Sequence, residues 1–160
     1  MRSYKGWFIG AILLWIAGGF QLSLSYPMSI WGASPDFLLV VVVVWSLFAE
    51  RRNGAAMGFF AGTIQGAVAG GHLATYSVIR TVIGFVVGWL TGLEFEGNIA
   101  VAFIVTASAT TVAQIAYLLL SPKGAILPFL LATIVSAMYN GVLAMPLYAL
   151  LKKVADSPRR

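Results

Sequence analysis

Long apolar runs alternate with short polar breaks along the whole chain. The breaks hold the proline, glycine and charged residues that end helices, and each run is of helical length. Because a membrane span needs roughly 20 mostly apolar residues, we expect the runs to be transmembrane helices. The predicted helices cover about residues 7–24, 35–49, 55–70, 73–93, 98–120 and 125–151. The pattern predicts an all-α integral membrane protein, a six-transmembrane-helix bundle forming one domain over residues 1–160.

The second predicted helix is short. Ser34 and Pro35 suit its N-cap and first helical position, and Asp36 complements the positive start of the helix. At 1.5 Å per residue the helix covers roughly 22 Å, less than the hydrocarbon core of about 30 Å. We therefore expect either local thinning of the membrane or shelter of this helix inside the bundle.

Glycine recurs at a spacing of four in the third predicted helix, and a ridge at the same spacing that ends in glycines follows in the fourth, which places each series on one helix face. The third helix has Gly54, Gly58, Gly62, Gly66 and Gly70, and the fourth has Tyr76, Arg80, Gly84, Gly88 and Gly92. Glycine costs a helix roughly 1 kcal/mol relative to alanine, so such a series needs a packing reason. In lipid, small residues let two helix backbones approach closely. We expect the two ridges to pack on each other through Gly58, Gly62, Gly66, Gly84 and Gly88.

The composition supports a membrane protein and excludes several kinds of site. Of the 160 residues, 60% are hydrophobic and 9% are charged, with a mean hydropathy of +0.92. The chain has no cysteine, which excludes disulfides and thiolate chemistry. It has one histidine, no carboxylate pair at interacting spacing and no base near a serine or threonine. We therefore expect no enzyme and neither cofactor nor metal.

Positive charge gathers at one set of predicted helix ends. With the N-terminus inside, eight of the ten Lys and Arg residues lie on the inner side, Lys123 lies outside and Arg80 lies within a span. The inner eight are Arg2, Lys5, Arg51, Arg52, Lys152, Lys153, Arg159 and Arg160. Because cytoplasmic loops carry the excess of Lys and Arg, the distribution predicts two cytoplasmic termini. It also explains the net charge of +5 as a topology signal, so we expect no nucleic-acid partner.

A few polar residues fall inside the predicted spans. Arg80 lies about seven residues into its helix, roughly 10 Å deep. An arginine at the centre of a span costs about 2.5–3.5 kcal/mol, so we expect it to pair in the interior, the alternative being that it snorkels to the headgroups. Gln65, Asp36 and His72 belong to the same membrane level, as does Gln114. Together these residues predict a polar pocket in the outer half of the bundle, the alternative being ordinary interhelical hydrogen bonds of about 0.6 kcal/mol.

One stretch carries an ordered series of these features. Pro35-Asp36 is followed by an unbroken aliphatic run and a basic turn, and then by Gly58-Phe59-Phe60-Ala61-Gly62 with a polar residue three positions later. This order resembles the rod shape-determining protein MreD family. The similarity continues through Gly71, Tyr76 and Gly84 and covers about residues 34–92. The remainder of the chain is similar in length, in its six-span layout and in its cytoplasmic termini.

The resemblance implies a non-enzymatic component of the bacterial inner membrane that helps to control cell shape and peptidoglycan synthesis. It implies an MreC-like single-span protein as the direct partner, with MreB, RodA and penicillin-binding protein 2 in a larger complex. The family commonly has aspartate where this chain has Gln65. The glutamine can still form hydrogen bonds at this position, but it cannot fill a role that needs a negative charge. The family fold is similar to that of the S-components of vitamin (ECF-type) transporters. That leaves a second hypothesis, a small-molecule-binding transporter subunit, and a weaker third, a small channel or exporter.

A chain with little mass outside the membrane acts through its helix surfaces. We expect the small-residue faces of the third and fourth helices to form grooves for the single transmembrane helix of the partner. Trp31 and Asp36, at the outer ends of the helices, are expected to add contacts.

The charge distribution makes a prediction about topology. Single cysteines introduced near Met1 and Arg160 should resist a membrane-impermeant thiol reagent in intact cells, whereas one near Lys123 should react. Labelling at either terminus in intact cells would overturn the orientation.

Overall fold

The computed structural model describes residues 4–91, 98–120 and 126–156, and within these ranges the chain is α-helical without a β-strand. The helices are α1 (Tyr4–Ser23), α2 (Phe37–Ser46), α3 (Arg51–Val68), α4 (Leu73–Leu90), α5 (Ile99–Leu120) and α6 (Ile126–Ala155). The expectation of an all-α bundle of six helices is confirmed. Arg2, Gly92, Lys123, Arg159 and Arg160, which entered the expectations above, lie outside the described residues.

The third helix begins earlier than expected. The connection between the second and third helices lies at residues 47–50 rather than 50–54, because α2 ends at Ser46 and Arg51, Arg52 and Asn53 already belong to α3. Arginine is a good helix former and none of the three residues breaks a helix. α6 likewise continues through Pro146 as far as Ala155.

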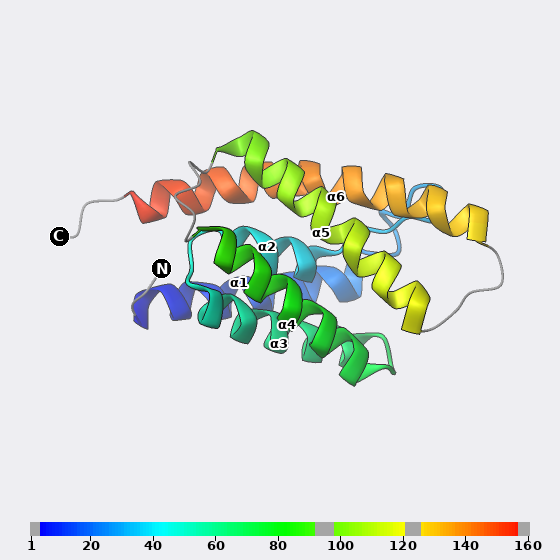
Figure 1. Cartoon of the computed structure of the whole chain (residues 1–160), viewed down its shortest axis with the longest axis horizontal. Helices are drawn as coiled ribbons and strands as arrows, with labels where there is room; N and C mark the ends of the chain where they lie inside the picture. Colours follow the sequence, from blue (N-terminus) through cyan, green and yellow to red (C-terminus); the bar gives the residue numbers. More distant parts are fainter. Residues whose placement is uncertain (1–3, 92–97, 121–125, 157–160) are drawn as a thin grey trace.

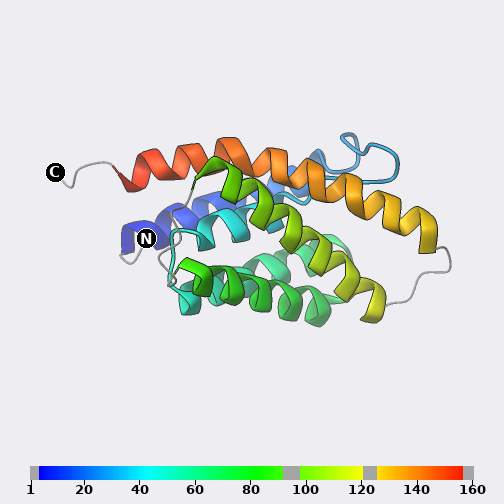
Figure 2. The same ribbon diagram turned by 45° about the horizontal axis from the view of Figure 1, so that its top comes forward.

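α2 occupies the centre of the bundle. The α3–α4 hairpin lies on one side of it and the α5–α6 hairpin on the other, and α1 runs alongside (Figures 1 and 2). The start of α1 and the end of α6 lie at the same end of the bundle (Figure 1). α5 crosses α2 obliquely, so that it contacts α6 and α4 while covering the centre (Figure 2).

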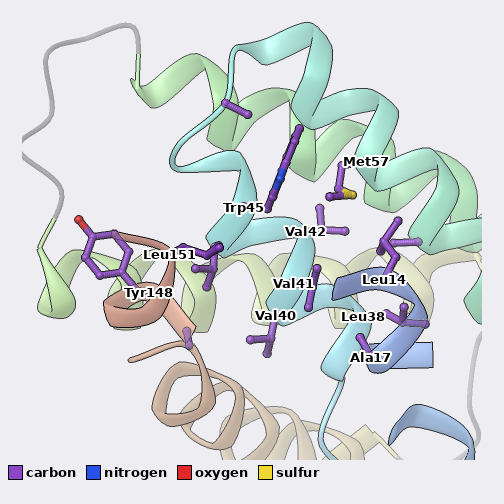
Figure 3. Packing of buried hydrophobic residues seen from close by; sticks show 14 of the residues in the cluster. Leu14, Ala17, Leu38, Val40, Val41, Val42, Trp45, Met57, Tyr148 and Leu151 are labelled. Carbon is purple, nitrogen blue, oxygen red and sulfur yellow. The ribbon is translucent and has the colours of Figure 1, made fainter. Parts of the chain in front are cut away.

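The interior position of α2 explains its unbroken aliphatic sequence. Every residue of α2 after Phe37 is buried. Val42 and Trp45 pack against Leu14 of α1 and Met57 of α3 (Figure 3), and the rings of Trp7 and Trp45 lie 5.3 Å apart. At ten residues α2 is about 15 Å long. Because its residues are buried, α2 is sheltered within the bundle, which is one of the two alternatives above.

The start of α2 differs from the expectation. Ser34 and Pro35 are not its N-cap and first residue, because the helix begins at Phe37 with Asp36 as the N-cap. The Asp36 carboxylate accepts a hydrogen bond from the Leu39 N–H at 2.9 Å. Asp36 also has an interaction partner in α4, and the two contacts together fix the start of the helix two residues later than expected.

The glycines of α3 and α4 lie where the two helix backbones meet. A side chain at Gly54 would strike the backbone of Gly84, and one at Gly58 would strike the carbonyl of Arg80. A Cβ at Gly62 would strike the backbone of Ser77. Near the two ends of the hairpin, a Cβ at Gly66 would lie 2.5 Å from the Leu73 Cα and one at Gly88 would lie 2.8 Å from the Arg51 Cα. Only hydrogen fits at these positions, so the two helices pack at backbone distance.

Gly70 does not belong to this contact. It has a φ of +69°, and a Cβ added to it would have no neighbouring atom within 4 Å, so it serves the turn between α3 and α4. The hairpin also corrects one functional expectation. The small-residue faces of α3 and α4 are filled by each other, so they offer no groove to a partner helix.

Within the described ranges, four helices are long and apolar enough to cross a membrane, namely α1, α4, α5 and α6. α2 is apolar but short, and α3 is long enough but less apolar. The chain is therefore a helical membrane bundle whose α2 depends on its neighbours for cover.

Bulk in the glycine contact should separate the hairpin. We predict that Gly62→Leu or Gly84→Leu lowers the free energy of unfolding in detergent by more than about 3 kcal/mol, the upper end of ordinary overpacking, because the opposing atoms are backbone. The control is Val86→Leu on the same helix as Gly84, since Val86 is 45% exposed. Equal stability of the glycine and control variants would show that the ridges do not pack.

Candidate functional site

The most polar contact in the bundle is an ion pair between α4 and the start of α2. Nη2 of Arg80 donates to both carboxylate oxygens of Asp36, at 2.8 and 2.6 Å. The Arg80 side chain is 0% exposed and that of Asp36 is 22% exposed. Arg80 therefore does not snorkel to the headgroups. It pairs inside the protein, with Asp36, as expected for an arginine within a span.

The close α3–α4 contact holds Arg80 in this position. The Arg80 carbonyl lies against Gly58, so the α4 main chain is fixed at the residue that forms the ion pair. A fixed main chain limits the conformations of a long side chain. The glycine contact and the ion pair thus act together, one on the backbone of Arg80 and the other on its guanidinium.

The first N–H groups of α2 are partly buried and have no partner within their own helix. Side chains from other helices accept them. Oδ1 of Asn140 on α6 accepts from the Asp36 N–H at 2.9 Å, and Oε1 of Gln21 on α1 accepts from the Phe37 N–H at 2.9 Å. Within hydrocarbon each unsatisfied group would cost several kcal/mol, so these bonds specify where α2 begins.

Asn140 extends this network to α5. Its Nδ2 donates to Oγ1 of Thr110 at 3.2 Å, and that hydroxyl donates to the carbonyl of Thr106 at 2.8 Å. Asn140 and Thr110 are buried. A single polar network therefore links the α2 start to α1, α4, α5 and α6.

A cavity of about 260 Å³ opens beside this network, at the end of the bundle where α1 leads into the loop before α2. Its walls come from that loop, from the N-cap of α2 and from the five other helices. The lining residues are Gln21, Gly32, Ser34, Pro35, Asp36, Gln65, Tyr76, Gln114, Tyr117, Phe129, Ala132, Thr133 and Ser136. Most of these side chains are polar, which is unusual inside a bundle whose core is otherwise aliphatic.

Several buried polar atoms around the cavity have no hydrogen-bond partner among the described residues. They are Oε1 of Gln65, the hydroxyl of Tyr117, and Nε and Nη1 of Arg80. The Tyr117 hydroxyl interacts electrostatically with the Arg80 guanidinium, and the Tyr117 ring lies 4.9 Å from that of Tyr76. The Tyr117 hydroxyl and the Arg80 guanidinium interact with each other, so the acceptor left over on the cavity wall is Oε1 of Gln65.

The site residues expected from the sequence fall into three groups. Asp36, Gln65 and Gln114 all line the cavity. Arg80 holds Asp36 at its edge. His72 is exposed, has a φ of 56°, makes no side-chain cap bond and does not line the cavity.

The sequence reasoning missed three site residues. Gln21, Asn140 and Tyr117 each contact the network or the cavity. The available signal was an amide inside an apolar helix, which applies to Gln21 and Asn140. Nothing in the local sequence distinguishes Tyr117 from a tyrosine at the membrane interface.

The chemistry of this site is hydrogen bonding. No group of three or more His, Asp or Glu side chains that could hold a metal occurs among the residues that the structure describes. The charge of the one carboxylate that lines the cavity, Asp36, is balanced by Arg80. The cavity thus offers amides, hydroxyls and one neutralised carboxylate.

A family model described as rod shape-determining protein MreD matches residues 1–154 of the chain. No curated protein and no solved structure matches the chain. The likeness to transporter S-components therefore stays a prediction.

The ion pair makes a prediction about stability. Arg80→Met should lower the free energy of unfolding in detergent by about 3 kcal/mol, because it leaves the Asp36 carboxylate without its partner. Arg80→Lys should lose less, since only one guanidinium nitrogen contacts the carboxylate. Arg52→Met, at an exposed arginine, is the control and should change little. If Arg80→Met were as stable as the control, the pair would be dispensable.

Proposed function

The chain belongs to the MreD family of rod shape-determining proteins, and on this premise we propose that it is a non-enzymatic component of the cell-elongation machinery in the bacterial inner membrane. The family match over residues 1–154 carries the proposal. The family is one of shape-determining membrane proteins and not a known enzyme family. Four apolar helices agree with a place in the membrane. In this role the protein helps to control cell shape and peptidoglycan synthesis.

Its direct partner is an MreC-like single-span protein, and MreB, RodA and penicillin-binding protein 2 belong to the larger complex. The glycine faces of α3 and α4 are already filled, so the partner uses other surfaces. The polar cavity is the best supported of these, because it contains a buried hydrogen-bonding atom without a partner among the described residues. A chain segment entering the cavity supplies an N–H group for Oε1 of Gln65.

The surroundings of the cavity suit a peptide. The loop before α2 exposes Tyr26 and Trp31, whose side chains are 90% and 87% exposed. Large aromatic side chains are typical anchors at protein interfaces. Gly32 and Ser34 of the same loop line the cavity, so a partner segment that enters it passes the loop and contacts both.

The orientation of the protein in the membrane decides on which face of the membrane the partner contacts the cavity. We propose six spans with both termini in the cytoplasm, which places the cavity at the outer face. Two observations support this. The start of α1 and the end of α6 share one end of the bundle (Figure 1). The arginines at the start of α3 and the lysines near the end of α6 lie at that end too. The cavity then faces the side where the soluble domain of a single-span partner begins, and occupancy of the cavity positions that domain.

The cavity also favours a second candidate, a small-molecule-binding subunit of a transporter. Its volume of about 260 Å³ is slightly below the roughly 300–1,000 Å³ typical of small-molecule pockets, so we rank this candidate second. Gene neighbourhood separates the two. MreB-like and MreC-like genes beside this one support the first, whereas a pair of transporter ATPase genes supports the second.

The partner proposal predicts a selective loss of binding. Gln65→Leu should weaken co-purification with an MreC-like partner by about five- to tenfold, since it removes an acceptor with no partner in the described chain. It should not lower thermal stability, because that acceptor makes no described internal bond. The matched control is Thr111→Val, which loses a hydroxyl bonded only to its own helix and lies away from the cavity.

Two results would contradict this proposal. Equal binding by the Gln65 and Thr111 variants would remove the cavity from the interface. Failure of the unaltered pair to co-purify at all would put the transporter-subunit candidate first.

A further inference from the structure

The opposite end of the bundle contains two neighbouring spaces that share Tyr148. One, of about 270 Å³, is lined by Leu47, Phe48, Leu90, Thr91, Val101, Val105 and Tyr148. The other, of about 590 Å³, is lined by Asn98, Ile99, Ala100, Tyr148, Ala149, Lys152, Lys153 and Asp156. The first is an apolar cavity between the end of α2, α4, α5 and α6, and the second is a groove between the start of α5 and the end of α6.

The apolar cavity exists because α2 is short. α2 ends at Ser46, and the following Leu47 and Phe48 fill only part of the space between the longer helices. Phe48 stacks on Tyr148 at 5.1 Å, which closes one side of the cavity. The remaining volume is bounded by α4 and α5 through Leu90, Val101 and Val105.

The described walls of this cavity offer no free hydrogen-bonding group to a polar occupant. Its one aliphatic hydroxyl, that of Thr91, already donates to the carbonyls of Ala49 and Gly88, at 3.2 and 2.8 Å. Figure 3 shows the Tyr148 hydroxyl directed away from Leu151 and the core. The occupant that suits such walls is hydrocarbon. A helix about 10–12 Å across does not fit in about 270 Å³.

The adjoining groove has the complementary polarity. Lys152 and Lys153 form part of its wall in the last turns of α6 and are both exposed. Neither makes an ion pair within the part of the chain that the structure describes. Asp156 is the acidic member of the described wall, so the lining residues together carry a net positive charge. Arg51 and Arg52, at the start of α3, lie at the same end of the bundle (Figure 1).

We propose that this end of the bundle binds one anionic phospholipid, with its phosphate on Lys152 and Lys153 and an acyl chain passing Tyr148 into the apolar cavity. Basic pockets between membrane helices attract anionic headgroups, and the apolar cavity takes the hydrocarbon that must follow the phosphate. The positive charge of Lys152 and Lys153 selects an anionic headgroup, and the space beyond the end of α2 holds an acyl chain of the lipid. The proposal is independent of the partner and of the polar cavity at the other end.

The test is native mass spectrometry of the detergent-purified full chain titrated with phosphatidylglycerol or phosphatidylcholine. One phosphatidylglycerol should be retained in preference to phosphatidylcholine. Lys152→Gln with Lys153→Gln should weaken that retention by about tenfold. The matched control, Arg51→Gln with Arg52→Gln, removes the same charge from the same end of the bundle outside the groove and should retain the lipid.

A second pair of variants tests the cavity for the acyl chain. Val105→Trp fills the cavity and should lower retention, whereas Ile104→Trp changes a side chain that is 60% exposed outside it and should not. Equal loss in the lysine and arginine variants would reduce the effect to general surface charge. If the unaltered protein retained both lipids equally, the proposed site would be wrong. It would also be wrong if the Val105→Trp and Ile104→Trp variants retained phosphatidylglycerol equally.

Discussion

The start of a helix inside a membrane is the constraint on which this fold depends. α2 begins within the bundle, where its first N–H groups have no partner in their own helix and need acceptors from the neighbouring helices. Asp36 caps the helix with its carboxylate, and Gln21 and Asn140 accept two further N–H groups. The negative cap is itself neutralised by Arg80. Removing any one of these groups leaves another buried polar group without its partner.

The glycine contact makes this arrangement possible. Arg80 reaches the α2 start from a helix whose backbone lies directly against α3 at Gly58. The same contact uses up the small-residue faces that would otherwise receive a neighbouring helix. The cavities lie instead at the two ends of the bundle, a polar one beside the start of α2 and an apolar one beyond its end.

Hydropathy and glycine spacing were sufficient to predict the helices, because both are local properties of the chain. The same reasoning placed Asp36, Gln65 and Gln114 at one membrane level, and these three residues line one cavity. Two errors have a common cause. The α2 start at Phe37 rather than Pro35, and the filling of the α3 and α4 faces, both depend on contacts between helices. Local propensity carries no information on which neighbour completes a cap or occupies a groove, and for the same reason Tyr117 was not predicted as a site residue.

A double-mutant cycle between Asp36 and Arg80 tests the central claim most directly. The variants are Asp36→Asn, Arg80→Met and the two combined, each measured as a free energy of unfolding in detergent. Asparagine still caps α2, so the cycle isolates the ion pair. We predict that the double variant is more stable than the sum of the single losses by about 2 kcal/mol or more, because removing both partners leaves no unpaired charge. Losses that add to within about 0.5 kcal/mol would contradict the claim, since additivity is the behaviour of residues that do not interact.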